Sequence, residues 1–169
     1  MESSSPPGLA RFNALAHDEV ARVLHEICSS TAWGRALLTG HPYATADDLL
    51  TASDAATAAL SPGDLAEAMA GHPPIGRPKP GDPASEREQR GMTDASEALR
   101  AEMLELNLAY QERFGHVFLI CATGATGEQM RDALRTRTTN TPDRENATTR
   151  TELGKINRIR LTRLLTEGE

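Results

Sequence analysis

Apolar residues recur at helical spacing along most of the chain. The first stripe comprises Leu15, Val20, Val23, Leu24 and Ile27, and this spacing predicts an amphipathic helix. Comparable patterns continue to Leu165, with one long interruption between residues 72 and 83. We therefore expect an all-α domain, a bundle of about seven or eight helices with a proline-rich loop.

Residues that cap helices stand at several of the expected helix starts. A hydroxyl or carboxylate side chain at such a position accepts a hydrogen bond from a free N–H of the first turn. Residues 45–48 and 61–64 each place an acid three residues after the capping hydroxyl. A last helix is expected from about 141 to 165. The expected caps are Ser30 or Thr31, Thr45, Ser61 and Thr126.

The interruption at residues 72–83 reads HPPIGRPKPGDP and contains five prolines and two glycines. Proline lacks a backbone donor and restricts the residue before it, so neither helix nor sheet is expected here. A stretch of this length inside a compact domain is usually a functional loop or a linker. Helical pattern resumes near Ser85 and runs to Phe114, with a break near Gly91.

A second non-helical segment is Val117–Ala122, a short apolar run without a partner strand elsewhere in the sequence. We expect it to be a buried extended segment between helices. The following Gly124-x-x-Gly127 is similar to a dinucleotide-binding loop, but Met130 stands where a further glycine would be needed. We interpret it as a turn followed by a helix N-terminus, whose free amides can bind an anionic or carbonyl oxygen.

The length and composition of the chain exclude several classes of function. A chain of 169 residues and 18.2 kDa is typical of one domain, and we expect a disordered tail at 1–8 followed by a single domain over 9–169. A net charge of −6 argues against nucleic-acid binding. The longest apolar run is too short to cross a membrane, and no leader opens the chain, which favours a cytoplasmic protein. Neither Cys28 and Cys121 nor the five histidines have the spacing of a metal site.

Three places carry candidate chemistry, and each has a structural alternative. His72 lies where a helix ends and the proline loop begins, although one histidine alone makes no site. Ser85 and Glu88 form a capping box, which together with Gln89 also fixes a carboxylate and an amide at a helix start. Arg160 lies between two apolar residues of the last helix and can point inward, with a fork suited to carboxylate or carbonyl oxygens.

Five short blocks follow one another along the chain. They are His72-Pro-Pro-Ile-Gly76, Ser85-x-x-Glu88-Gln89, Asn107-x-x-Tyr110 with Arg113-Phe114-Gly115, Phe118-Leu-Ile-Cys-Ala122, and Lys155-Ile156 with Arg160-Leu161. In these blocks and their order, the chain resembles the 2-oxo-4-hydroxy-4-carboxy-5-ureidoimidazoline (OHCU) decarboxylase family. Members of this family complete the conversion of urate to (S)-allantoin. The similarity extends from about Phe12 to Leu165.

The resemblance implies an all-α bundle, often a homodimer, that needs no cofactor and no metal. It implies that His72 and Glu88 are catalytic. From the chemistry of these side chains we expect His72 to act as acid/base and Glu88 to orient either His72 or the substrate hydroxyl. The substrate-binding positions that it implies are Pro73, Ser85, Gln89, Phe118, Ile120, Ala122, Thr123 and Arg160, those from 118 to 123 through main-chain groups.

Two other functions stay open at this point. The domain could be a non-catalytic scaffold that binds a partner through its proline loop, with His72 and Glu88 purely structural. It could also be a related acid/base lyase or hydrolase acting on another ureido or imidazolone compound. A nucleophilic role for Cys121 is not expected, because a thiol in an apolar run is usually inert.

Overall fold

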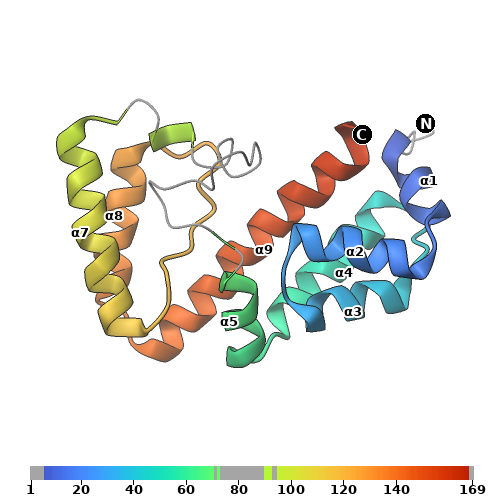
Figure 1. The fold of residues 1–169 in the computed structure, drawn as a ribbon, viewed down its shortest axis with the longest axis horizontal. Helices are drawn as coiled ribbons and strands as arrows, with labels where there is room; N and C mark the ends of the chain where they lie inside the picture. Colours follow the sequence, from blue (N-terminus) through green and yellow to red (C-terminus); the bar gives the residue numbers. More distant parts are fainter. Residues whose placement is uncertain (1–5, 71, 73–89, 93–94, 168–169) are drawn as a thin grey trace. The chain divides into compact units, whose positions relative to one another are not determined.

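The described part of the chain is largely helical, with a longer non-helical segment over residues 115–126 (Figure 1). The computed structural model describes residues 6–70, 72, 90–92 and 95–167, and within these ranges there are eight α-helices, one short 3-10 helix and no strand. The all-α prediction is confirmed. No helix in these ranges is long and apolar enough to span a membrane. The helices are α1 (Pro7–Ala14), α2 (His17–Ile27), α3 (Thr31–Gly40), α4 (Ala46–Ala58), α5 (Pro62–Ala70), η1 (Arg90–Met92), α7 (Glu97–Phe114), α8 (Gly127–Thr138) and α9 (Pro142–Glu167).

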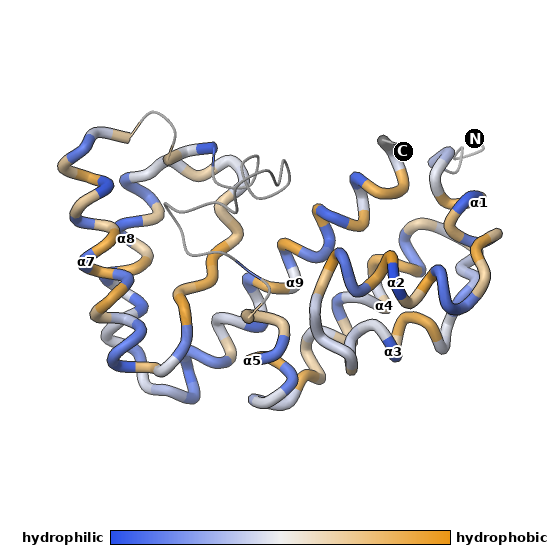
Figure 2. Tube along the Cα trace, in the orientation of Figure 1, coloured by the Kyte–Doolittle hydropathy of each residue, from blue (hydrophilic) through white to orange (hydrophobic). Residues whose placement is uncertain are grey.

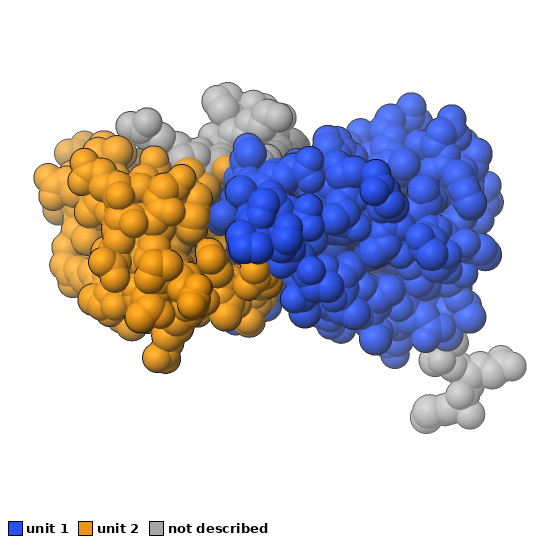
Figure 3. Space-filling view, turned by 90° about the horizontal axis from the view of Figure 1, so that it is seen from below, with its two compact units in different colours: residues 1–71, 153–169 blue, residues 72–152 orange. Residues whose placement is uncertain are grey.

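The chain divides into two compact units (Figure 3). Unit 1 comprises residues 1–71 and 153–169, and unit 2 comprises residues 72–152. The division falls inside α9, so this helix contributes residues to both units. The expectation of a single domain over 9–169 stays a prediction.

The helix caps expected from the sequence are present. In each case the hydroxyl of the capping residue accepts a hydrogen bond from the backbone N–H three residues later, at 3.0–3.2 Å. At α8 the Gln129 side chain also accepts from the N–H of Thr126, which completes a capping box. These bonds lie within one turn, which explains why local sequence predicts them. The caps are Ser30, Thr45, Ser61 and Thr126.

Three helix starts differ from the sequence pattern. The stripe that begins at Leu15 predicts one helix, but Leu15 is the C-cap of α1 and α2 begins only at His17. Helix α1 begins at Pro7, two residues before the first apolar position at Leu9, because proline is well suited to the first turn. Around the expected break at Gly91 the chain forms η1, and α7 begins only at Glu97, where Ser96 accepts the N–H of Leu99. The helix start expected at residue 85 lies outside the described residues.

The core of unit 1 surrounds Trp33, which is fully buried. Its indole N–H donates to the hydroxyl of Ser53 at 3.2 Å, and the Asn157 amide of α9 donates to the hydroxyl of Thr57 at 3.4 Å. The Thr57 hydroxyl itself donates to the Ser53 carbonyl. A buried polar group without a partner is costly, so this chain of bonds allows polar side chains inside an otherwise aliphatic core.

The core of unit 2 lies between α7, α8 and the segment that joins them. Figure 2 shows hydrophobic residues along the middle of this connecting segment, which corresponds to the apolar run 117–122. The segment begins after Gly115, which ends α7 with a φ of 79°, a value that favours glycine. Buried side chains from all three elements form one cluster, which includes Leu99, Met103, Tyr110, Phe118, Ala122, Met130 and Leu134.

Gly154 provides a test of the packing of α9. A glycine inside a helix costs about 1 kcal/mol relative to alanine, and a Cβ at this position would lie 3.8 Å from Thr57 Cγ2, an ordinary contact. We expect Gly154→Ala to raise the free energy of unfolding by about 0.5–1 kcal/mol in urea denaturation. Gly8→Ala is the matched control and should lower it, because a Cβ there would lie 2.5 Å from the Leu165 carbonyl oxygen. A loss of stability in Gly154→Ala would contradict the packing described here.

Candidate active site

The predicted site residues fall into three groups in the structure. Pro73, Ser85, Glu88 and Gln89 lie outside the described residues, as does most of the proline loop. His72 is described; it is half-buried and follows the last residue of α5 by two positions. The remaining positions are the segment 118–123 in unit 2 and Arg160 in unit 1. The roles of all these residues stay predictions.

The segment Val117–Ala122 is non-helical and largely buried, as the sequence predicts. Phe118, Leu119 and Ala122 are each less than 5% exposed, whereas Ile120 and Cys121 are half-buried. Apolar side chains therefore fasten the segment to the core. The backbone N–H and C=O groups of the segment are the polar groups that can bind a ligand.

The residues after this segment form a turn and then a helix. Gly124 has a φ of 80°, and the N–H of Ala125 donates to the Ala122 carbonyl at 3.0 Å. At Gly127, the first residue of α8, a Cβ would lie 2.8 Å from Leu99 Cδ2, so the glycine allows a close approach to α7. The interpretation of Gly124-x-x-Gly127 as a turn followed by a helix N-terminus is confirmed.

A buried ion pair between Arg137 and Glu145 contacts the main chain of the segment. The Arg137 guanidinium of α8 contacts both carboxylate oxygens of Glu145 in α9 at 2.6–3.2 Å, and the two side chains are 8% and 0% exposed. The third arm of the guanidinium, Nη1, donates to the carbonyl oxygen of Leu119 at 2.7 Å. Arg137 thereby joins the extended segment to the two helices that follow it.

Further groups complete the environment of Glu145. The hydroxyl of Tyr110 in α7 and the amide of Asn140 both donate to its carboxylate. Burial, followed by the hydrogen bond to Glu145 and its negative charge, raises the pKa of Tyr110, so its hydroxyl stays protonated and donates. The Arg137 guanidinium also lies over the Phe118 ring, 4.5 Å from its centroid. The buried charges are thus paired and hydrogen-bonded, as burial requires.

A second side chain contacts the main chain of the segment from α9. The N–H of Cys121 donates to Glu152 Oε1 at 3.1 Å. Together with the bond from Arg137 to Leu119, this fixes two peptide groups that are two residues apart. Arg137, Glu145 and Glu152 belong to none of the sequence patterns that predict site residues. Arg137 and Glu145 lie on different helices, so no helical spacing relates them.

Arg160 has a defined partner within unit 1. Its Nη1 donates to the carbonyl oxygen of Ile27 at 2.7 Å, and the side chain is partly buried. The fork of the guanidinium therefore binds a carbonyl oxygen, the type of acceptor expected for this residue. Beside it, burial raises the pKa of the Cys28 thiol, which disfavours the reactive thiolate.

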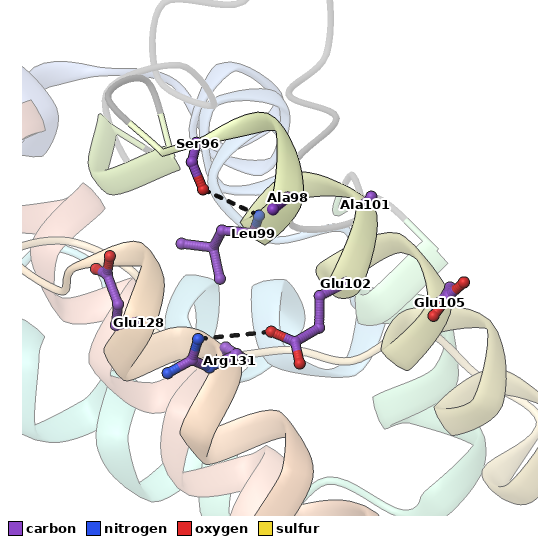
Figure 4. A pocket seen from close by; sticks show the side chains of 8 residues that line it. All are labelled: Ser96, Ala98, Leu99, Ala101, Glu102, Glu105, Glu128 and Arg131. Carbon is purple, nitrogen blue, oxygen red and sulfur yellow. Dashed lines mark hydrogen bonds and ion pairs between the residues drawn. The ribbon is translucent and has the colours of Figure 1, made fainter.

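Unit 2 also has a cleft between α7 and α8, with a volume of about 540 Å3 (Figure 4). Figure 4 shows Glu102 and Arg131 pointing toward one another across it, and Glu102 also pairs with Arg135. None of its lining residues is among the predicted site residues. The cleft is lined by Ser96, Ala98, Leu99, Ala101, Glu102, Glu105, Glu128 and Arg131.

In the described part of the chain, no group of three or more His, Cys, Asp or Glu side chains could hold a metal ion.

Comparison with known proteins identifies the class to which this fold and site belong. The family model described as OHCU decarboxylase matches residues 13–162, which is most of the chain. The chain therefore belongs to the OHCU decarboxylase family, and the resemblance inferred from the five sequence blocks is confirmed.

Individual relatives agree with this assignment. The chain is 29% identical over 147 residues to the uric acid degradation bifunctional protein TTL of Arabidopsis thaliana. This match covers 83% of the chain but 45% of the relative, so the chain spans about half the length of that protein.

Two solved structures are similar in fold. One is OHCU decarboxylase in the presence of (S)-allantoin, with a TM-score of 0.74 and 28% identity over 85% of this chain and 96% of that one. The other is (S)-allantoin synthase, with a TM-score of 0.72 and 21% identity over 93% of this chain and 54% of that one. At that identity, the second likeness concerns the fold alone.

The buried ion pair yields a stability prediction. Glu145→Gln keeps the shape of the side chain but leaves the buried Arg137 charge without a counter-charge, so the free energy of unfolding should fall by about 3 kcal/mol. Asp54→Ala is the control, because its pair with Arg158 is about half-exposed and should be worth less than about 1 kcal/mol. Urea denaturation of both variants measures the difference. Equal, small losses would contradict the importance of burial.

Proposed function

We propose that the chain catalyses the decarboxylation of OHCU to (S)-allantoin. The observation that carries this proposal is the family match over residues 13–162, joined to the likeness to an OHCU decarboxylase structure solved with (S)-allantoin. The urate-degrading relative from Arabidopsis thaliana supports the same substrate class.

The chemistry of this substrate sets what the protein has to supply. Breaking the bond between the ring carbon and the carboxylate releases CO2 and leaves an electron pair on that carbon. The conjugated imidazoline ring can accept the pair, so the substrate provides its own electron sink. The pair moves onto the ring nitrogen of the C=N bond, which takes up one proton. A second proton must reach one face of the neighbouring carbon that bears the ureido group, and the hydroxyl carbon becomes a carbonyl as its proton leaves.

The main chain of 118–123 supplies hydrogen-bonding groups for substrate oxygens in this proposal. Preorganised donors stabilise oxygen charge as it develops in the transition state. Arg160 contributes a guanidinium that suits a carboxylate or carbonyl oxygen. The reaction also requires the carboxylate to be held out of the plane of the ring, where the breaking bond overlaps with the π-system.

His72 acts as acid/base in this reaction, and Glu88 orients either its imidazole or the substrate hydroxyl. Histidine titrates near neutral pH, so it can both accept and return a proton under ordinary conditions. The junction between α5 and the proline loop restricts the backbone at His72, since proline follows directly in the sequence. This restriction of the backbone limits the directions from which the His72 imidazole can deliver a proton.

The proposal also covers cofactors, metal ions and binding partners. Because the substrate absorbs its own negative charge, the enzyme works without an organic cofactor or a metal. The chain acts on a small molecule, and its net charge of −6 disfavours nucleic acid as a partner. A homodimer and a cytoplasmic location stay predictions.

The decisive experiment couples urate oxidation and hydrolysis to the purified protein and follows circular dichroism of the allantoin formed. We expect rapid formation of the single (S) enantiomer. His72→Asn should lower the rate constant by at least about 100-fold, the usual range for loss of an acid/base group. Racemic product at the spontaneous rate with the unaltered protein would contradict the function. It would favour a scaffold domain, or a lyase for another ureido compound.

Glu88 allows a catalytic role to be separated from a capping role. We expect Glu88→Gln to lower the rate constant by about tenfold or more with little change in melting temperature, because an amide can still cap a helix. Glu88→Ala should lower both quantities. If both variants keep the full rate and only melt earlier, Glu88 is a helix cap and has no part in the reaction.

A further inference from the structure

The extended segment is bound on its main chain by two side chains that play no part in the function proposed so far. Arg137 Nη1 donates to the Leu119 carbonyl at 2.7 Å, and Glu152 Oε1 accepts the N–H of Cys121 at 3.1 Å. Both contacts come from the helices that follow the segment, and all of these residues belong to unit 2.

These contacts matter because they are all made to one side of the segment. In an extended chain the N–H and C=O of one residue point to the same side, and successive residues alternate. Leu119 and Cys121 are two residues apart, so the groups bound by Arg137 and Glu152 lie on one edge. The peptide groups of Phe118, Ile120 and Ala122 then lie along the opposite edge.

The opposite edge coincides with the expected substrate-binding positions. Among the described residues, no hydrogen bond reaches the peptide groups of Phe118 or Ile120, and at Ala122 the carbonyl accepts from Ala125. Binding on one edge therefore leaves the other edge available for a ligand. Family resemblance assigns four main-chain positions of this segment to substrate binding: Phe118, Ile120 and Ala122 belong to this edge, and Thr123 follows it at the turn.

The Arg137 side chain is itself fixed by several contacts. Its guanidinium is 8% exposed, pairs with both oxygens of Glu145 and lies over the Phe118 ring. A planar fork can pair with both oxygens of a carboxylate and reach a carbonyl from separate nitrogens, whereas a lysine ammonium offers one nitrogen on a flexible stem. The position of the Leu119 carbonyl is thus fixed by a buried, fully paired group.

We propose that Arg137 and Glu152 are positioning residues for catalysis: they bind one edge of the 118–122 main chain and so aim the opposite edge at the substrate. This inference rests on the proposed function. Neither residue touches the reacting atoms. Their effect passes through the peptide groups of the segment, whose displacement weakens the hydrogen bonds that bind the substrate oxygens.

A purely structural role predicts a different kinetic result. Loss of stability leaves part of the protein unfolded, which lowers the apparent kcat and leaves KM unchanged. Misplaced binding groups weaken the hold on the substrate and raise KM. The split between KM and kcat therefore separates the two roles.

The test uses the full chain with freshly generated OHCU and follows (S)-allantoin by circular dichroism. We expect Arg137→Lys and Glu152→Ala each to raise KM about tenfold, and Glu152→Gln to stay within about threefold of the unaltered protein, since its amide oxygen can still accept from Cys121. Leu99→Ala is the control: it creates a cavity in the α7–α8 core, so it should melt earlier with an unchanged KM.

Each outcome decides between the alternatives. An unchanged KM in both Arg137→Lys and Glu152→Ala, with an active unaltered protein, overturns the positioning role and leaves the proposed function intact. An equal rise of KM in Leu99→Ala overturns it as well, because instability alone would then account for the effect. If Arg137→Lys does not fold, the comparison of Glu152→Ala with Glu152→Gln decides. An unaltered protein that does not accelerate the reaction overturns the proposed function, and the positioning role with it.

Discussion

The buried pair between Arg137 and Glu145 is the interaction on which the rest of unit 2 depends. Two opposite charges away from water are stable only when they meet each other and their remaining hydrogen bonds are made. This requirement fixes the end of α8 against the start of α9, brings the Tyr110 hydroxyl to the carboxylate and holds the Leu119 carbonyl. One electrostatic constraint thus determines where the extended segment runs.

This arrangement suits the reaction class of the family. A substrate that carries several carbonyl and carboxylate oxygens needs directional donors and acceptors more than it needs a hydrophobic pocket. An extended segment with buried Phe118 and Ala122 side chains offers its peptide groups in a rigid row. Rigid dipoles stabilise charge without having to reorient during the reaction. In the proposed function, the apolar core of unit 2 therefore supports the polar chemistry assigned to this segment.

The parts of the fold that follow from local sequence were predictable. The caps at Ser30, Thr45, Ser61 and Thr126 involve residues three positions apart, so the chain order contains the whole interaction. The extended segment was likewise visible as an apolar run flanked by Gly115 and Gly124.

The Arg137–Glu145 pair was not predictable from pattern. It depends on a reversal of direction near Asn140 that brings two helices together, and no periodicity records that reversal. The same holds for Arg160, whose acceptor, the Ile27 carbonyl, is 133 residues away. For His72 and Glu88, family membership adds weight to roles that single residues could not establish.

Recognition by peptide groups has a consequence for how this family can diverge. Every residue except proline offers the same N–H and C=O, so exchanges among aliphatic side chains at 118–122 alter volume while leaving the hydrogen-bonding row intact. Such a surface tolerates sequence drift, which fits a shared fold at 28% identity. In the proposed role, ligand recognition depends on the path of the chain, and this path depends on the distant residues Arg137 and Glu152.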